Sequence, residues 1–120
     1  MEPTIDCRDL LMRLGDEQIL VLDCRSENDP YSPDLQIPGA LRISLEDLPR
    51  AAHCLPDDEL IVVCGLAQGA RTWRACRLLR LRGLDAVVLA GGLNAWISQG
   101  FPTERPEQAR RPTADIPFGL

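Results

Sequence analysis

The stretch of sequence that decides the fold spans residues 59–82 and reads ELIVVCGLAQGARTWRACRLLRLR. Its apolar run from Leu60 to Val63 predicts a buried β-strand, which delivers Cys64 at its end. A glycine-containing loop then leads to Arg71, where a helical pattern begins. The stretch is therefore predicted to form a strand, a cysteine, a loop and a helix.

This arrangement predicts a reactive cysteine beside an anion-binding loop. The first N–H groups of a helix have no intrahelical acceptor, and the helix dipole adds positive potential there. Cysteines at helix N-termini or beside arginine have pKa values lowered from about 8.5 to roughly 3.5–7.5. Gly65 and Gly69 permit the unusual backbone angles that such a loop needs. We therefore expect Cys64 to be an easily ionised nucleophile and Arg71 to help bind an anion.

Length and composition indicate one globular domain. The chain has 120 residues, of which 45% are hydrophobic, and this suffices for one core but not for two domains. No apolar run approaches the ~18 residues that a membrane span needs, and the acidic N-terminus does not resemble a secretory signal. We therefore expect a cytoplasmic protein without a membrane partner. The net charge of −5 argues against nucleic acid as a partner, because phosphate binding needs a basic face.

The cysteines are odd in number and lie at least ten positions apart. They are Cys7, Cys24, Cys54, Cys64 and Cys76. This spacing indicates neither a disulfide framework nor a zinc site, and no cofactor is expected. Apart from Cys64, these residues are interpreted as small buried hydrophobic side chains.

Strands and helices are expected to alternate along the chain. The expected strands are residues 19–22, 40–43, 60–63 and 86–89. The expected helices are residues 5–14, residues 45–54 with an interruption near Pro49, residues 71–83, and a last helix around 95–97 that ends at Gly100. Such alternation predicts an α/β fold, with a parallel sheet flanked by helices on both faces. Ligands bind beyond the carboxyl ends of such strands, where Asp23, Cys24 and Cys64 are expected. Residues 1–104 are expected to form the domain, and 105–120 an irregular tail.

Two side-chain patterns predict core packing. Small residues at helical spacing form one stripe of the helix that begins at Arg71, and they are Thr72, Ala75, Cys76, Leu79 and Gly83. Small side chains allow a helix to lie close to a sheet. Trp96 is expected in the core, whereas the sequence does not decide whether Trp73 lines a pocket or covers a neighbouring loop.

Several short motifs occur in a fixed order between Ile5 and Glu104. They are Asp23 with Arg25, Ile37-Pro38-Gly39-Ala40, Cys64, Gly69 with Arg71, Gly91-Gly92, Ala95-Trp96 and Gly100. In order and spacing the chain resembles the single-domain rhodanese-like sulfurtransferases. The resemblance implies a rhodanese fold, a five-stranded parallel sheet between helices. It also implies that the cysteine becomes a persulfide cradled by loop amides.

The chain departs from the family pattern at two places. Gln36 stands where the family commonly has histidine, at a position that we interpret as structural. Arg71 follows Cys64 by seven positions, whereas the family usually has five and its phosphatase and arsenate-reductase branch six. The longer loop predicts a wider anion nest. Its members are Gly65, Leu66, Ala67, Gln68, Gly69, Ala70 and Arg71.

Three functions are compatible with these residues. The first is sulfur transfer through a Cys64 persulfide. The donor is thiosulfate or a persulfide, and the acceptor is cyanide or a thiol, either free or on a protein. The second is an oxyanion (arsenate or phosphate) reductase or phosphatase with the same cysteine, for which Arg71 suits the oxyanion and Cys24 is the candidate second thiol. The third is a non-catalytic binding or regulatory module.

Overall fold

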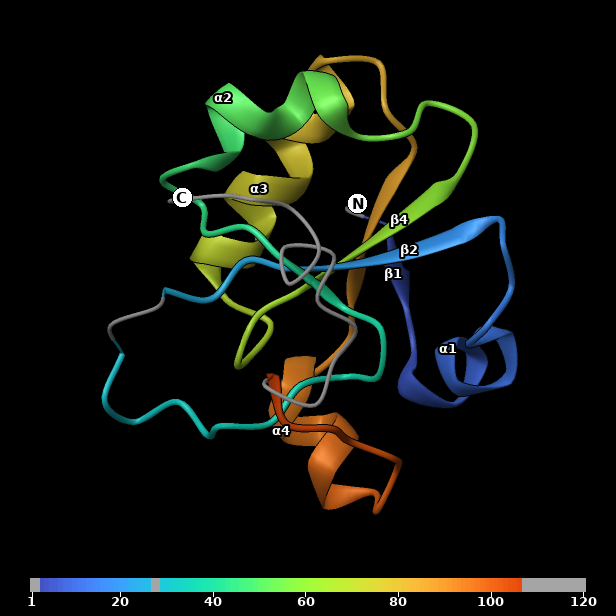
Figure 1. Ribbon diagram of the computed structural model, residues 1–120, viewed down its shortest axis with the longest axis vertical. Helices are drawn as coiled ribbons and strands as arrows, with labels where there is room; N and C mark the ends of the chain where they lie inside the picture. The colour runs from blue at the N-terminus through green and yellow to red at the C-terminus, as the bar shows by residue number, and fades with distance from the viewer. Residues whose placement is uncertain (1–2, 27–28, 107–120) are drawn as a thin grey trace, which may run out of the picture.

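A five-stranded parallel sheet lies between two layers of helices in the computed structural model, which describes residues 3–26 and 29–106 (Figure 1). The strands are β1 (Thr4–Ile5), β2 (Ile19–Asp23), β3 (Leu41–Arg42), β4 (Leu60–Cys64) and β5 (Ala86–Leu89), in the spatial order β1-β5-β4-β2-β3. The helices are α1 (Cys7–Arg13), α2 (Leu48–Ala51) with a 3₁₀ turn (Ala52–Cys54), α3 (Ala70–Leu81) and α4 (Gly92–Ser98). The predicted fold class is confirmed. The last 14 residues of the predicted tail, 107–120, lie outside the described residues.

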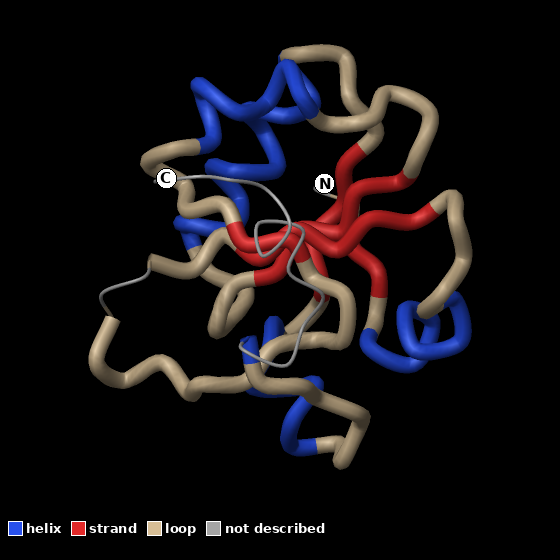
Figure 2. Tube along the Cα trace, in the orientation of Figure 1, coloured by secondary structure: helices blue, strands red, loops and turns tan. Residues whose placement is uncertain are grey.

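The central strands β2 and β4 are apolar except for Asp23 at the end of β2, because helices cover both faces of the sheet (Figure 2). Alternate side chains of β2 and β4 point to opposite faces, so Leu22 and Val63 enter one core while Val21 and Val62 enter the other. Helices α2 and α3 pack in the first core, and α1 and α4 pack in the second. All four of these strand residues are buried.

Most of the predicted packing residues are buried, but Cys54, which was interpreted as a buried side chain, is exposed. Four residues of the small stripe on α3 are buried against the sheet, and they are Thr72, Ala75, Cys76 and Leu79. Trp96 has no exposed surface, and its Nε1 donates a hydrogen bond to the carbonyl oxygen of Pro102 at 2.7 Å. Trp73 is partly buried against the core beneath α3, so it covers a neighbouring element rather than lining a pocket.

Two local predictions are wrong. Ile5 was expected in the first helix but lies in β1, which pairs with β5, while α1 begins after Asp6, whose carboxylate caps Asp9 N at 2.8 Å. A two-residue edge strand has no periodicity, so only its partner reveals it. The helix expected at 45–54 begins only at Leu48, because Pro49 fits the first helical turn instead of interrupting the helix.

The carboxyl ends of β2 and β4 meet at the point where the strand order reverses. Strand β2 leads outward to β3 on one side, and β4 leads to β5 on the other. Asp23 pairs with Cys64 in the register, and the N–H of Cys24 donates to the carbonyl oxygen of Cys64 at 2.9 Å. The three residues therefore share one edge of the sheet, as predicted. Parallel sheets form their ligand crevice at such a switch point.

Gln36 is a structural residue, as predicted. Its side chain is 2% exposed, and Nε2 donates to Ala40 O at 3.3 Å and to the Glu104 carboxylate at 3.0 Å. The same carboxylate accepts the N–H of Gly39 at 2.9 Å.

None of the helices in residues 3–26 and 29–106 has the length and apolarity that crossing a membrane requires.

Burial predicts how strongly two leucines of α3 contribute to stability. Leu79 is fully buried, whereas Leu81 is 81% exposed. We expect Leu79→Ala to lower the free energy of unfolding in urea by about 2–5 kcal/mol, because it leaves a cavity. Leu81→Ala should change it by no more than about 0.5 kcal/mol. Equal losses in the two variants would contradict the packing of α3 described above.

Candidate functional site

The loop that follows Cys64 is fastened to the N-terminus of α4. The carbonyl oxygen of Gly65 accepts the N–H of Leu93 at 2.8 Å, and that of Leu66 accepts the N–H of Asn94 at 2.9 Å. These two donors belong to the first turn of α4, where N–H groups lack intrahelical acceptors. The start of α4 thus fixes the direction of the first loop carbonyls.

The next two residues of the loop, Ala67 and Gln68, are also held by hydrogen bonds from α3 and from the start of α4. The hydroxyl of Thr72 donates to the carbonyl oxygen of Ala67 at 3.1 Å, and the N–H of Gly91 donates to Oε1 of Gln68 at 3.0 Å. Three successive loop carbonyls therefore point toward α3 and α4. The loop is anchored by hydrogen bonds along its length, although it is longer than is usual in the family.

The loop N–H groups point away from those anchors. A trans peptide is planar, so the N–H of each following residue points opposite to the anchored carbonyl. Within the described residues, the backbone N–H groups of residues 66–71 donate to no acceptor. They are free to bind a ligand with negative charge.

A pocket of about 380 Å³ opens beside the loop. It is lined by Arg25, Ser26, Asp29, Gly65, Leu66, Ala67, Gly69, Ala70, Arg71 and Thr72. Six of the seven predicted nest residues are among them, and Gln68 is not, because its side chain binds Gly91. Ser26 and Asp29 also line the pocket, and their only signal in the sequence is a place in the long loop that follows β2.

The Cys64 side chain is a buried, protonated thiol. It is 1% exposed, does not line the pocket, and its Sγ donates to the carbonyl oxygen of Gly65 at 3.3 Å. Burial raises the pKa of the Cys64 thiol far above its ordinary value; Asp23 raises the pKa further, and Arg25 opposes both. The predicted easily ionised thiol is therefore wrong for this conformation, because loss of water outweighs the nearby positive groups.

Arg71 lines the pocket but its guanidinium is held at the rim. Nε donates to the carbonyl oxygen of Cys24 at 3.1 Å, and Nη1 and Nη2 donate to the two carboxylate oxygens of Glu46 at 2.9 and 2.5 Å. The hydrogen bonds lower the pKa of Glu46 and raise that of Arg71. The anion that Arg71 binds in this structure is the carboxylate of Glu46. No sequence signal pointed to Glu46, which lies 25 positions from its partner.

Arg25 forms the structural centre of the loop after β2. Its Nε and Nη2 bind the Asp23 carboxylate at 2.8–3.0 Å, and both residues are buried. Nη1 donates to Ser32 Oγ and Pro33 O, and Nη2 also donates to Leu35 O, at 2.7–3.0 Å. These bonds use all five guanidinium N–H groups. Arg25 therefore shapes the pocket without a donor left for a ligand.

Cys24 and Cys64 lie on opposite faces of the sheet. Cys24 belongs to the core beneath α3, whereas Cys64 belongs to the core beneath α4. Burial, with a further contribution from Asp23 and opposed by Arg71, raises the pKa of Cys24 to about 11. Two cysteines whose Cβ atoms point apart are not bridged without backbone movement. This geometry weighs against Cys24 as the second thiol of a reductase.

Comparison with known proteins identifies the family. The model of the family described as "Rhodanese-like domain" matches residues 6–99. The chain belongs to the rhodanese-like domain family. This rhodanese-like domain is 33% identical to a protein named "Sulfurtransferase" from Allochromatium vinosum. The alignment covers 86% of this chain and 95% of the relative. It is 39% identical, over only 48% of its length and 34% of the relative, to "Protein HIGH ARSENIC CONTENT 1, mitochondrial" from Arabidopsis thaliana.

The solved structures agree with this assignment. The solution NMR structure of a rhodanese-like domain from Anabaena is 38% identical to this rhodanese-like domain, with a TM-score of 0.73 over 93% of this chain and 86% of the other. Family and sulfurtransferase-named relative together support a sulfurtransferase-type role.

The raised thiol pKa predicts how stability depends on pH. Above about pH 9 the unfolded chain loses the Cys64 proton while the folded protein keeps it, so the unfolded state binds fewer protons and stability falls as pH rises. Between pH 9 and 10.5, in reductant, the free energy of unfolding should fall less steeply with pH for Cys64→Ser than for the wild type. The two slopes should differ by about 1.4 kcal/mol per pH unit. Identical slopes would contradict the buried thiol.

The contact between α4 and the loop predicts a second stability difference. A Cβ on Gly92 would lie 2.8 Å from Ala67 Cα and from the carbonyl oxygens of Gly65 and Leu66, whereas one on Gly100 would meet nothing within 4 Å. Both glycines have positive φ, so Gly100→Ala should cost about 1–2 kcal/mol of unfolding free energy. Gly92→Ala should cost roughly 1–3 kcal/mol more in the same urea titration. Equal costs would show that the loop does not depend on this contact.

Proposed function

We propose that the protein transfers sulfane sulfur and that Cys64 carries the sulfur as a persulfide. The donor is thiosulfate or a persulfide, and the acceptor is cyanide or a thiol, either free or on a protein. One observation carries the proposal: unbonded loop N–H groups line a pocket at the end of the strand that delivers Cys64. Family membership supports the same reaction type.

The transfer balances without an added oxidant or reductant. The Cys64 thiol loses its proton, and its sulfur attacks the outer sulfur of a persulfide donor R–S–SH. An S–S bond forms to Cys64, the donor S–S bond breaks, and the leaving thiolate takes up the proton as RSH. With thiosulfate, the leaving group is sulfite. An acceptor thiol then attacks the outer sulfur and restores the Cys64 thiol.

The loop amides act on the outer sulfur rather than on Sγ. The outer sulfur of a persulfide lies about 2.05 Å beyond Sγ, so attachment carries the negative charge outward from the buried position of Cys64. Fixed N–H dipoles stabilise developing charge because they need no reorganisation during the reaction. The anchored carbonyls of Gly65, Leu66 and Ala67 support this role, since they hold the intervening amides away from the helices.

A non-catalytic binding module is the second candidate function. It is favoured by the burial of Cys64 and by its absence from the pocket lining. An oxyanion reductase has less support, because Cys24 faces the opposite core.

Intact-mass measurement tests the proposed function. After incubation with thiosulfate, or separately with cysteine hydropersulfide, the wild type should gain the mass of one sulfur atom and lose it again on addition of cyanide. Cys64→Ser should gain nothing, because the attacking sulfur is missing. Cys54→Ser removes an exposed thiol and should behave as the wild type.

Two results would overturn the proposal. One is the absence of added sulfur on the wild type with both donors, which would leave the binding module as the function. The other is the same addition on Cys64→Ser, which would move the reaction to a different cysteine.

A further inference from the structure

The cations that line the pocket are each neutralised by a carboxylate. Arg25 is bound by Asp23 through three nitrogen–oxygen contacts of 2.8–3.0 Å. Arg71 is bound by both carboxylate oxygens of Glu46. Arg42 also approaches Asp23, with Nε 3.8 Å from Oδ1, but it does not line the pocket. Among the described residues, the lining thus contains no cation without a carboxylate partner.

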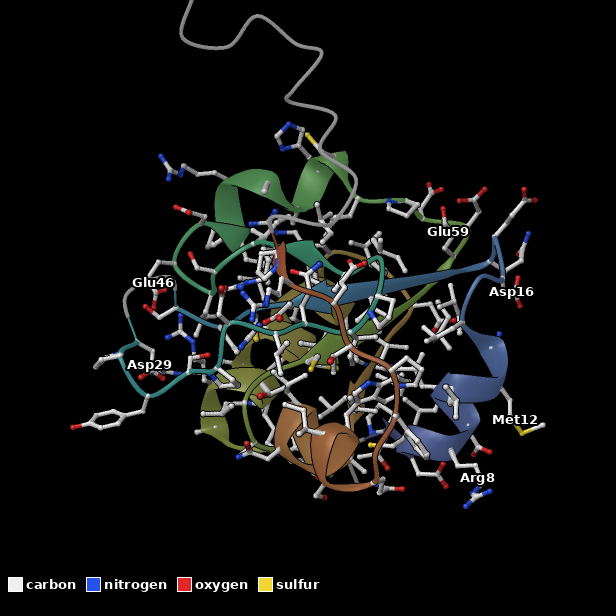
Figure 3. The ribbon with its side chains drawn as sticks, turned by 60° about the horizontal axis from the view of Figure 1, so that its bottom comes forward. Arg8, Met12, Asp16, Asp29, Glu46 and Glu59 are labelled. Carbon is white, nitrogen blue, oxygen red and sulfur yellow. The ribbon has the colours of Figure 1, made fainter. Side chains whose placement is uncertain are left out.

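A further carboxylate lies at the same rim. Asp29 lines the pocket, and it forms no ion pair with any residue in the described ranges. Figure 3 shows Asp29 and Glu46 at the same edge of the molecule. The negative potential of Asp29 reaches Arg71, whose pKa it raises. An anion that enters the pocket therefore meets the carboxylate of Asp29 and an Arg71 that is already paired with Glu46.

We propose that Glu46 is a specificity-determining residue: by neutralising Arg71 it disfavours dianionic sulfur donors and favours donors that bring at most one negative charge. This inference rests on the proposed sulfur transfer and names the substrate class of the same pocket. Neutral amides suffice for one negatively charged sulfur. A dianion such as thiosulfate gains more from an unpaired guanidinium, but the carboxylate of Glu46 accepts from Nη1 and Nη2 of Arg71 and neutralises its charge.

Glu46→Gln tests the proposal by removing the charge and keeping the side-chain size. Glu46 is well exposed, so the variant should fold normally. Asp47→Asn is the matched control, because it removes the same charge one position further on, where the carboxylate binds Arg50 instead. Inorganic sulfate, an unreactive dianion, reports binding by calorimetry, and thiosulfate and cysteine hydropersulfide report persulfide formation on Cys64. All measurements are made at ~0.1 M ionic strength, which screens remote charges.

We expect Glu46→Gln to tighten sulfate binding and to lower the KM for thiosulfate, each by roughly three- to fivefold. The KM for cysteine hydropersulfide should change by less than about twofold, and Asp47→Asn should leave both donors and sulfate unchanged. In an Arg71→Met background, Glu46→Gln should no longer tighten sulfate binding, because the two residues act as one pair.

Several outcomes would overturn the inference. These are sulfate binding that does not tighten in Glu46→Gln, equal changes for the two donors, and a fall in kcat with both, which would make Glu46 a positioning residue for Arg71. Failure of the proposed function is seen separately. If Cys64 gains no sulfur but sulfate tightens as expected, the transfer reaction is wrong and the charge selection by Glu46 stands.

Discussion

The pairing of β2 with β4 is the constraint on which the rest of the structure depends. It brings Asp23 level with Cys64 and places both at the point where the strand order reverses. The loops that leave these two strands therefore face each other across one crevice. The pairing also explains why the thiol is buried: Cys64 is the last residue of a strand that is covered on both faces. Position and low acidity of the thiol thus have the same origin.

In this pocket, unbonded backbone N–H groups rather than unpaired cations are available to bind negative charge. A buried guanidinium without a partner is costly, and Arg25 avoids that cost through Asp23 and three loop acceptors. Arg71 is less buried, yet it too is neutralised, by Glu46. What remains for a ligand is a row of neutral N–H groups. In the sulfur transfer that we propose, such a row stabilises one negatively charged sulfur.

Sequence periodicity predicted the layers of the fold but not its pairings across distance. Continuous apolar runs indicated β2, β4 and β5, and the small stripe of α3 indicated its buried face, because both patterns are local. Strand β1 was missed since its two residues acquire their conformation only from β5. Most residues of the loop after Cys64 line a pocket, but the predicted acidity of Cys64 is wrong, because a local rule on helix N-termini omits burial. Glu46 lies outside any motif.

The loop after Cys64 is held in place by its contacts with α3 and α4. Additional residues between a cysteine and an arginine would widen an anion nest if the loop were free. Here the anchors on α3 and α4 hold three carbonyls. Gly92 allows α4 to approach the loop backbone closely. The anchors therefore fix the course of the loop, and Arg71 at its end lies within hydrogen-bond reach of Glu46.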